Sequence, residues 1–351
     1  QILKDLEEAI ATLPVEYPED ALGRITKGAA MGLKSRVLLY QGDWANAAKA
    51  AKDVMDLNQY FLFPDYQGLF LEVNERAAGC EIMMRRCYTP KIDPSYLYYP
   101  LGEWPAFAPT KQLADSYYMN DGLPISKSPK YDAQNPHMNR DPRFAASLFY
   151  PGCQYLNFMI KAPDPEVSKD SIQIPSWLLN STGYRSKKHF DGTLTNAEDE
   201  GRDTYFMRYA EILLNYAEAL NESGATKTDV LTWVDLIRER AGLKGVEESW
   251  DTYTNNKKYE TIDGRREIIQ QERGIELAFE AQRFWDLRRW KLAFQEQNKP
   301  ITGWNTQYST NEDYYTEQLI YTQEFRIRNY FWPILDKELY SNKNLVQNYG
   351  W

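Results

Sequence analysis

Apolar residues recur at helical spacing along two consecutive segments near the start of the chain. The stripe consists of Ala30, Leu33, Val37 and Tyr40, followed by Trp44, Ala47, Ala48, Ala51, Val54 and Met55. Gly42 and Asp43 interrupt it, and spacings of three and four residues on either side predict two helices joined by a short turn. Small alanines allow antiparallel helices to approach closely. We therefore predict a helical hairpin of the tetratricopeptide type.

The same pattern returns in the second half of the chain. Its apolar positions are Tyr209, Ile212, Leu213, Tyr216, Ala217 and Leu220, followed by Val230, Val234, Ile237 and Ala241. Gly224 breaks the first of these helices, and Gly242 stands where a glycine commonly ends a helix. These positions predict a second helical hairpin. One longer helix is expected after it, from about Gly264 to Phe294, because apolar residues keep helical spacing there.

The segments outside these helices are rich in Pro, Gly, Asn, Asp and Tyr and show few helical repeats. Connections this long between helices are usually functional. We therefore divide the chain into four parts. Residues 1–57 form tetratricopeptide-like helices, 58–206 a loop-rich ligand-binding region, 207–295 the helical hairpin and long helix, and 296–351 a C-terminal loop-rich segment of the same domain.

Composition and charge narrow the class of partner. With 43% hydrophobic residues, the 351-residue chain has enough apolar side chains for a sizeable core. The net charge of −9 argues against nucleic acid, whose phosphates require clustered Lys and Arg. The 26 Tyr and 10 Trp are unusual. Their flat apolar faces with a polar edge suit sugar rings, although they equally suit a large core.

Metal and redox chemistry have few residues to draw on. The two histidines, His137 and His189, are far apart, and the three cysteines form no CxxC pair. This leaves little for a histidine-based metal site or a Ser-His-Asp triad. Spacing alone leaves a disulfide between Cys80 and Cys87 open. We predict no cofactor and no metal.

The ends of the chain are also informative. No apolar run is long enough to span a membrane. Residues Gln1–Ile10 read as a helix already under way, without an initiator Met. We therefore expect an internal fragment or a processed chain, with apolar surface exposed at the edge formed by its first helix.

Six segments follow one another in the order of a known family. They are Asp121–Ile125, Asp141–Phe144, Asp203–Glu222, Arg238–Leu243, Glu272–Trp290 and Trp332–Trp351. Together they resemble the SusD/RagB family of outer-membrane nutrient-binding lipoproteins, and Glu272–Trp290 is the most specific of them.

The resemblance implies an all-α-dominated fold, a tetratricopeptide-like α-superhelix with a loop-rich, mixed subdomain. It implies a lipoprotein on the outward-facing surface of the cell outer membrane. Such a protein captures oligosaccharide for a SusC-like, TonB-dependent transporter. Family members are longer at the N-terminus, where they carry a lipid anchor, and this chain begins after that part. The only expected link to a membrane is therefore an anchor absent from this chain.

The charged segment Glu272–Trp290 has two possible interpretations. Glu276 and Glu280 lie one helical turn apart, and paired carboxylates perform acid–base catalysis in glycosidases. However, adjacent turns seldom place carboxylates on opposite sides of one glycosidic bond. Spacings of three residues instead predict ion pairs along the helix, namely Arg273–Glu276, Glu280–Arg283 and Asp286–Arg289. We favour this structural role and predict no enzyme activity.

A second acidic group includes Glu198, Asp199, Glu200 and Asp203. Its oxygens suit Ca²⁺, but the spacing is not that of an EF-hand loop. We therefore expect a solvated loop.

The aromatic loops carry the functional hypothesis. Residues 96–104 place Tyr96, Tyr98, Tyr99 and Trp104 among Pro and Gly, and some of these rings should be exposed. Rings on stiff loops lose little entropy on binding and make good stacking platforms. The resemblance also implies ligand-contacting aromatics in this region, although these rings could instead pack beneath the loops. Secondary candidates are Trp177 and Trp304, and nearby polar candidates are Glu103, Lys111 and Asp115.

Several functions remain open on this basis. The first is glycan capture by stacking and hydrogen bonding, followed by transfer to the transporter. The second is peptide capture by the same architecture, which aromatic loops alone do not distinguish from glycan capture. A glycoside hydrolase and a helical adaptor with only a protein partner are less favoured.

Overall fold

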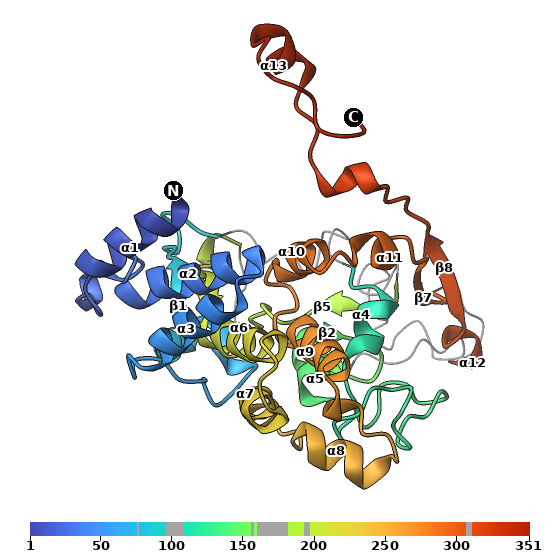
Figure 1. The fold of residues 1–351 in the computed structure, drawn as a ribbon. Coiled ribbons are helices and arrows are strands. Elements are labelled where there is room, and N and C mark those ends of the chain that lie inside the picture. Colours follow the sequence, from blue (N-terminus) through green and yellow to red (C-terminus); the bar gives the residue numbers. More distant parts are fainter. Residues whose placement is uncertain (76, 96–107, 156–157, 160–181, 193–196, 307–310) are drawn as a thin grey trace.

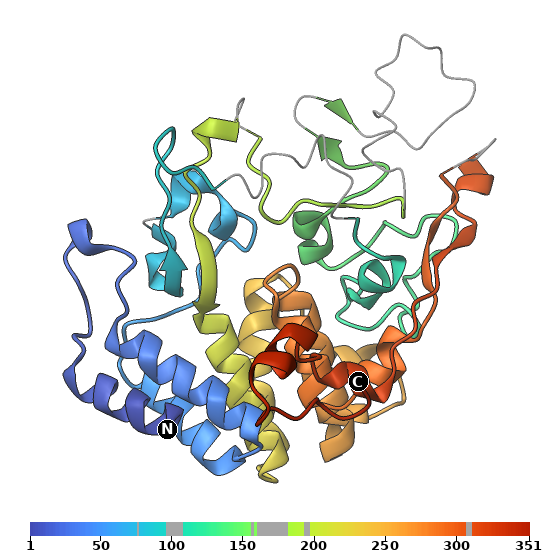
Figure 2. The same ribbon diagram turned by 90° about the horizontal axis from the view of Figure 1, so that it is seen from above.

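The computed structural model describes residues 1–75, 77–95, 108–155, 158–159, 182–192, 197–306 and 311–351. Helices form one layer of the molecule, and short strands with long connections form a second layer beside it (Figures 1 and 2). No helix among the described residues is long and apolar enough to cross a membrane.

The first predicted hairpin is confirmed as α2 (Lys27–Gln41) and α3 (Trp44–Met55), preceded by α1 (Ile2–Thr12). The Thr26 hydroxyl caps α2 by accepting a hydrogen bond from the Ala29 amide at 3.2 Å. Gly42 ends this helix with a φ of 74°, a conformation that favours glycine. Ala47 and Ala51 are fully buried, which lets α3 lie close to α2 and α6.

The second predicted hairpin is confirmed as α6 (Tyr209–Glu222) and α7 (Lys227–Arg240). Gly224 and Gly242 both adopt positive φ, at 78° and 79°, and close the two helices as their positions indicated. Helix α6 contacts α3, α7 and α9 (Ile262–Glu276), so it lies at the centre of the helical layer. The short helix α8 (Val246–Tyr253) connects α7 to α9.

The prediction of one helix from Gly264 to Phe294 was wrong. The segment forms three helices: α9, α10 (Gln282–Arg289) and α11 (Ala293–Gln297). The Lys188 amine donates to the carbonyl oxygens of Glu276 and Ala278, each at 2.9 Å. A continuous helix would use those two carbonyls for its own amides. A distant side chain therefore ends α9.

The second layer contains short antiparallel strand pairs. β1 (Ile82–Arg86) pairs with β6 (Thr204–Arg208), which leads directly into α6. Three further pairs are β2 (Leu148–Phe149) with β5 (Arg185–Ser186), β3 (Gln154–Tyr155) with β4 (Phe158–Met159), and β7 (Ile301–Trp304) with β8 (Glu317–Tyr321). The helices α4 (Lys111–Ser116), α5 (Pro142–Ser147) and α12 (Asn311–Tyr314) belong to the same layer.

After β8 the chain first packs against α10 and α11, where Phe325 is buried beside Leu287 and Ala293, and the C-terminal residues then leave the body of the protein (Figure 1). They include α13 (Asp336–Ser341) and run out beyond α10 and α11 (Figure 1). Trp332 and Tyr340 are 72% and 75% exposed. The division of the chain into four parts remains a prediction.

Candidate ligand-binding site

Five of the six predicted aromatic contacts lie outside the described residues. These are Tyr96, Tyr98, Tyr99, Trp104 and Trp177, and the polar candidate Glu103 lies outside them as well. The candidate site is therefore built here from the described residues that flank these segments.

The flanks of three segments that are far apart in sequence lie together. The Thr182 hydroxyl donates to the Pro109 carbonyl at 2.6 Å, which joins the residues after 96–107 to those after 160–181. The Trp304 amide donates to the Thr182 carbonyl at 3.0 Å, and this places the strand before 307–310 at the same point. Pro109, Thr182 and Trp304, here called the anchors, thus bring together described residues that lie next to 96–107, 160–181 and 307–310 in the sequence.

The anchors rest on a buried aromatic cluster. The Trp304 indole N–H donates to the Tyr184 hydroxyl at 2.8 Å, and the Tyr314 hydroxyl donates to the Gly183 carbonyl at 3.3 Å. Gly183 has a φ of 80°, and a Cβ at this position would lie 2.7 Å from the Tyr314 hydroxyl and 2.9 Å from Trp304 Cδ1. Only glycine fits this turn without displacing the rings.

Trp304 does not have the exposed ring that we expected. It is 4% exposed, and the Lys111 amine lies 4.8 Å from its ring centre. Both faces and edges of the indole are therefore occupied by the protein, because β7 folds back onto Thr182 and Tyr184. Trp304 belongs to the buried aromatic cluster that supports the anchors, and its ring has no open face on which a sugar could stack.

Lys111 and Asp115 contact each other. The Lys111 amine donates to Asp115 at 2.6 Å and lies 3.4 Å from Glu317. Burial opposes the charge of Lys111, but these two carboxylates raise the pKa of its amine above the usual value. The amine therefore stays protonated and ties α4 to β8.

His137 lies in the same aromatic cluster, with its Nε2 3.1 Å from the Tyr184 hydroxyl. Burial, together with the nearby Arg140, lowers the pKa of His137 to about 3. The imidazole is neutral at physiological pH. It acts as a packed ring between Phe144 and Tyr150.

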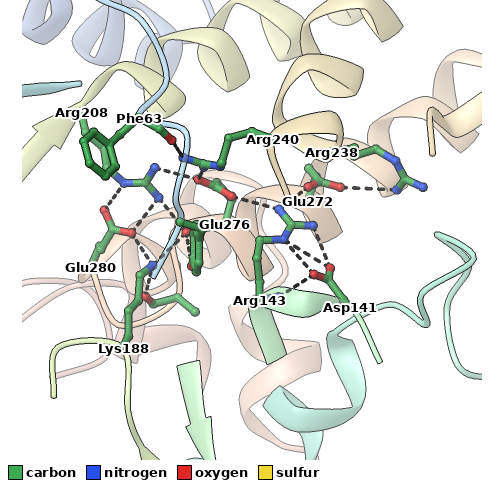
Figure 3. Close-up of polar contacts among 12 residues, drawn as sticks. Phe63, Asp141, Arg143, Lys188, Arg208, Arg238, Arg240, Glu272, Glu276 and Glu280 are labelled. Atoms are coloured by element: carbon green, nitrogen blue, oxygen red, sulfur yellow. Dashed lines mark hydrogen bonds and ion pairs between the residues drawn. The ribbon is translucent and has the colours of Figure 1, made fainter. Parts of the chain in front are cut away.

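The two carboxylates considered for hydrolysis lie in a buried ion network (Figure 3). Glu276 contacts Arg208 at 2.7 Å and Arg143 at 3.0 Å, and it also contacts Arg240. Glu280 contacts Lys188 at 2.6 Å and Arg208 at 2.7 Å. Burial alone would raise their pKa values, but the cations hold both well below the usual range. Glu276 is fully buried and both carboxylates are held by cations, so this pair stabilises the scaffold.

The predicted ion pairs along this segment are partly correct. Asp286 and Arg289 pair at 2.7 Å, as expected. Arg273 pairs with Asp286 at 3.1 Å. Glu276 and Glu280 are held by cations from other elements, namely Arg143 of α5, Arg208 of β6 and Lys188, which follows β5. The break between α9 and α10 removes the helical geometry that the Glu280–Arg283 pair required. Arg273 and Glu276 both lie in α9, but each is paired with a residue from another element instead.

The acidic group is a solvated loop only in part, because Glu198 is exposed but Glu200 and Asp203 are buried. Glu200 is fully buried and lies 3.1 Å from Arg202, and Asp203 lies 3.3 Å from Arg85. In the part of the chain that the structure describes, no group of His, Cys, Asp and Glu is arranged to hold a metal ion. Cys80 and Cys87 are free thiols, so the disulfide left open by the sequence is not formed.

Sequence reasoning missed the turn formed by Thr182, Gly183 and Tyr184. The available signal was the short Thr-Gly-Tyr run that follows a long polar connection, since a glycine there marks a turn. Nothing in the local pattern indicated that this turn meets Pro109 and Trp304.

A scaffold of helical hairpins, with long connections anchored on one side of it, defines a class of helical proteins that present loops to a partner or ligand. The chain belongs to the SusD family, because residues 72–351 match the family's model. The resemblance drawn from the sequence is thereby confirmed.

Individual relatives agree with this assignment. The chain is 29% identical to SusD-like protein P2 of Formosa agariphila, over 99% of this chain and 63% of that protein. It is also similar to two solved structures from Bacteroides fragilis. One is a SusD-like protein with 28% identity and a TM-score of 0.78, and the other a SusD-like carbohydrate binding protein with 26% identity and a TM-score of 0.79.

Both structural matches cover nearly all of this chain, 99% and 98%, and 70% of the other chain in each case. The predicted all-α-dominated, tetratricopeptide-like fold is confirmed. The chain spans less than two thirds of the length of the curated relative, at 63%.

Proposed function

We propose that this protein is a non-catalytic glycan-binding protein that captures oligosaccharide at the cell surface. The observation that carries the proposal is the meeting of Pro109, Thr182 and Trp304. Pro109 and Thr182 closely follow, in the sequence, the segments that contain Trp104, Trp177 and the tyrosines near residue 98. Membership in the SusD family supports the proposal, as does a structurally similar protein described as carbohydrate binding.

The proposed mechanism is stacking of sugar rings on Trp104, Tyr96, Tyr98, Tyr99 and Trp177, with hydrogen bonds from neighbouring polar groups. Aromatic rings supply apolar area and fix the orientation of a ligand face. The rigid base beneath the anchors limits the entropy lost on binding. Catalysis is not part of the proposal, since Glu276 and Glu280 are enclosed by cations.

The proposal extends to the cellular setting. The bound oligosaccharide is passed to a SusC-like, TonB-dependent transporter of the outer membrane. The protein is held at the outward-facing surface by a lipid anchor outside these residues. These steps rest on the family, and a co-purification of the protein with the transporter from its native membrane tests them.

A binding screen tests the capture role directly. Starch, xylan, mannan, laminarin, pectin and a set of short peptides are titrated against the protein and against Trp104→Ala. Trp332→Ala is the matched control, because Trp332 is an exposed tryptophan on the C-terminal segment. We expect a polysaccharide to bind the parent and the control, and to bind Trp104→Ala at least about tenfold more weakly, which corresponds to about 1.4 kcal/mol.

Other outcomes redirect the proposal. Equal binding by the parent and Trp104→Ala would retain glycan capture and reject this platform. Binding of peptides alone would replace glycan capture with peptide capture. Release of new reducing ends would reject the non-catalytic role.

A further inference from the structure

A cavity of about 590 Å³ lies in the helical scaffold, between α2, β6 and the turn from α9 to α10. Its volume is within the range of small-ligand sites. None of its lining residues belongs to the anchors of the candidate site. In both ribbon views, α2 and the β7–β8 pair lie on opposite sides of the molecule (Figures 1 and 2).

Two half-exposed aromatic rings stand at this cavity. Trp285 of α10 is 50% exposed, and Phe206 of β6 is 48% exposed. Large aromatic side chains that stay half open beside a cavity offer flat apolar faces to a ligand. They suit the C–H face of a ring-shaped molecule.

The charged lining residues are already neutralised by the protein. The Arg36 guanidinium donates to both oxygens of Glu211, at 2.7 and 2.6 Å. Glu280 is held by Lys188 and Arg208, as described above. A charged ligand would therefore find no uncompensated counter-charge on these residues, so the cavity favours a neutral one.

Polar groups in the lining have hydrogen-bonding capacity. The Thr204 hydroxyl is buried and has no hydrogen-bond partner within the described part of the chain. Buried polar groups normally have partners, and an exception calls for an explanation. Gln282 adds a largely buried amide to the same lining. Thr204 itself is half-buried in the lining, so a χ1 rotation that exchanges its methyl and hydroxyl groups would turn the hydroxyl toward a ligand, whose own hydroxyl groups would provide the missing partner.

The wall between α9 and α10 has an unusual backbone. Phe279 and Ala281 line the cavity with φ values of 63° and 60°. Residues other than glycine seldom adopt this region, and such strain gathers at functional sites. Glu280 lies between Phe279 and Ala281 in the sequence, and its ion pairs with Lys188 and Arg208 hold the wall in this shape.

We propose that this cavity is a second glycan subsite, which takes one ring of a neutral oligosaccharide between Trp285 and Phe206. Thr204 and Gln282 bond its hydroxyl groups. This inference rests on the proposed glycan capture and adds a site on the scaffold, away from the aromatic loops. Two separate subsites would let one long chain, or two short ones, contact the protein at the same time.

Calorimetric titration tests the subsite with neutral oligosaccharides of glucose, mannose, galactose and xylose as probes. The parent is compared with Trp285→Ala, Trp104→Ala and the control Trp332→Ala, which is an exposed tryptophan outside the cavity lining. We expect two sites in the parent and the control. Trp285→Ala should retain one site and weaken the other about tenfold or more, or about 1.4 kcal/mol.

Thr204→Val provides a second variant that does not depend on removing a large ring. The change keeps the shape and removes the unpartnered hydroxyl, so the melting temperature should stay the same or rise. Binding at the scaffold subsite should nevertheless weaken about threefold. A variant that is only structurally perturbed would not combine higher stability with weaker binding.

The outcomes separate this inference from the proposed function. If Trp104→Ala weakens binding while Trp285→Ala and Thr204→Val titrate like the parent, the second subsite is refuted and glycan capture stands. If Trp285→Ala alone weakens binding, the subsite is supported and the loop platform is refuted. If no oligosaccharide binds the parent, both proposals fail.

Discussion

The buried ion network around Glu276 gives the sharpest stability prediction. Glu276 is fully buried and accepts hydrogen bonds from three guanidinium groups, those of Arg143, Arg208 and Arg240. In Glu276→Gln the side-chain shape is kept, but one carboxylate oxygen becomes an NH₂ group that faces a guanidinium donor. The variant therefore removes one of the carboxylate charges that compensate these cations, and at least one charged hydrogen bond, while Asp141, Glu272, Glu81 and Glu280 remain.

The magnitude follows from these contacts. A hydrogen bond to a charged group contributes about 1.5–3 kcal/mol, and leaving a buried charge uncompensated adds to this loss. Breaking a buried ion pair on one side typically costs about 3–5 kcal/mol. We expect Glu276→Gln to lower the free energy of unfolding by that amount, which is a large share of the stability of an ordinary domain.

Urea unfolding at pH 7, followed by circular dichroism, measures this loss. Urea is preferred because guanidinium chloride would screen the charges under study. Glu248→Gln is the matched control, since Glu248 pairs with Lys244 on the exposed surface of α8 and should matter much less. If Glu276→Gln unfolds within about 1 kcal/mol of the parent, with an unchanged urea dependence, the reasoning about uncompensated cations is wrong.

Two further predictions concern acid sensitivity and the base of the candidate site. The pKa of His137 is lowered to about 3 by burial and by Arg140, so the folded state favours the neutral ring. Its contribution to stability is complete above the unfolded pKa of about 6.5 and is lost as pH falls toward 3, at about 1.4 kcal/mol per pH unit. Urea unfolding of the parent and of His137→Asn between pH 7.5 and 5 isolates the contribution of His137 to the free energy of unfolding. Glu75, whose pKa burial raises to about 7, titrates in both proteins, so its effect cancels in the difference. Parallel pH profiles would contradict the assignment. In the second prediction, Gly183→Ala lowers the melting temperature more than Gly224→Ala and also weakens glycan binding. Both glycines have positive φ, but only at Gly183 would the new Cβ meet other side chains, whereas nothing lies within 4 Å of it at Gly224. Equal losses in the two variants would show that backbone strain alone decides the effect.

The helical layer was predictable because its causes are local. The apolar spacing of α2, α3, α6 and α7, with Gly42 at the end of α2, records which face of each helix is buried. Helix periodicity and glycine conformation act over a few residues, so one sequence is enough to read them. The family resemblance added the loop-rich second layer, which local patterns only indicated by their Pro and Gly content.

The end of α9 and the burial of Trp304 depended on tertiary structure. Lys188, which takes the carbonyls of Glu276 and Ala278, comes from a distant connection that no local pattern ties to α9. Periodicity extended the helix across this point because Phe279 and Phe284 keep helical spacing. Trp304 looked like a loop aromatic, and only its contact with Tyr184 gives it a buried place.

The sequence by itself determined the fold class, the two helical hairpins and the segments in which to look for a ligand site. Only the tertiary structure decided that Pro109, Thr182 and Trp304 meet, and that a separate cavity lies beside Trp285. The physical reason is the separation in sequence between the residues that interact. Helix formation is set by neighbours a few residues apart, whereas anchors, cavities and buried ion networks are made by side chains that the fold brings together from distant parts of the chain.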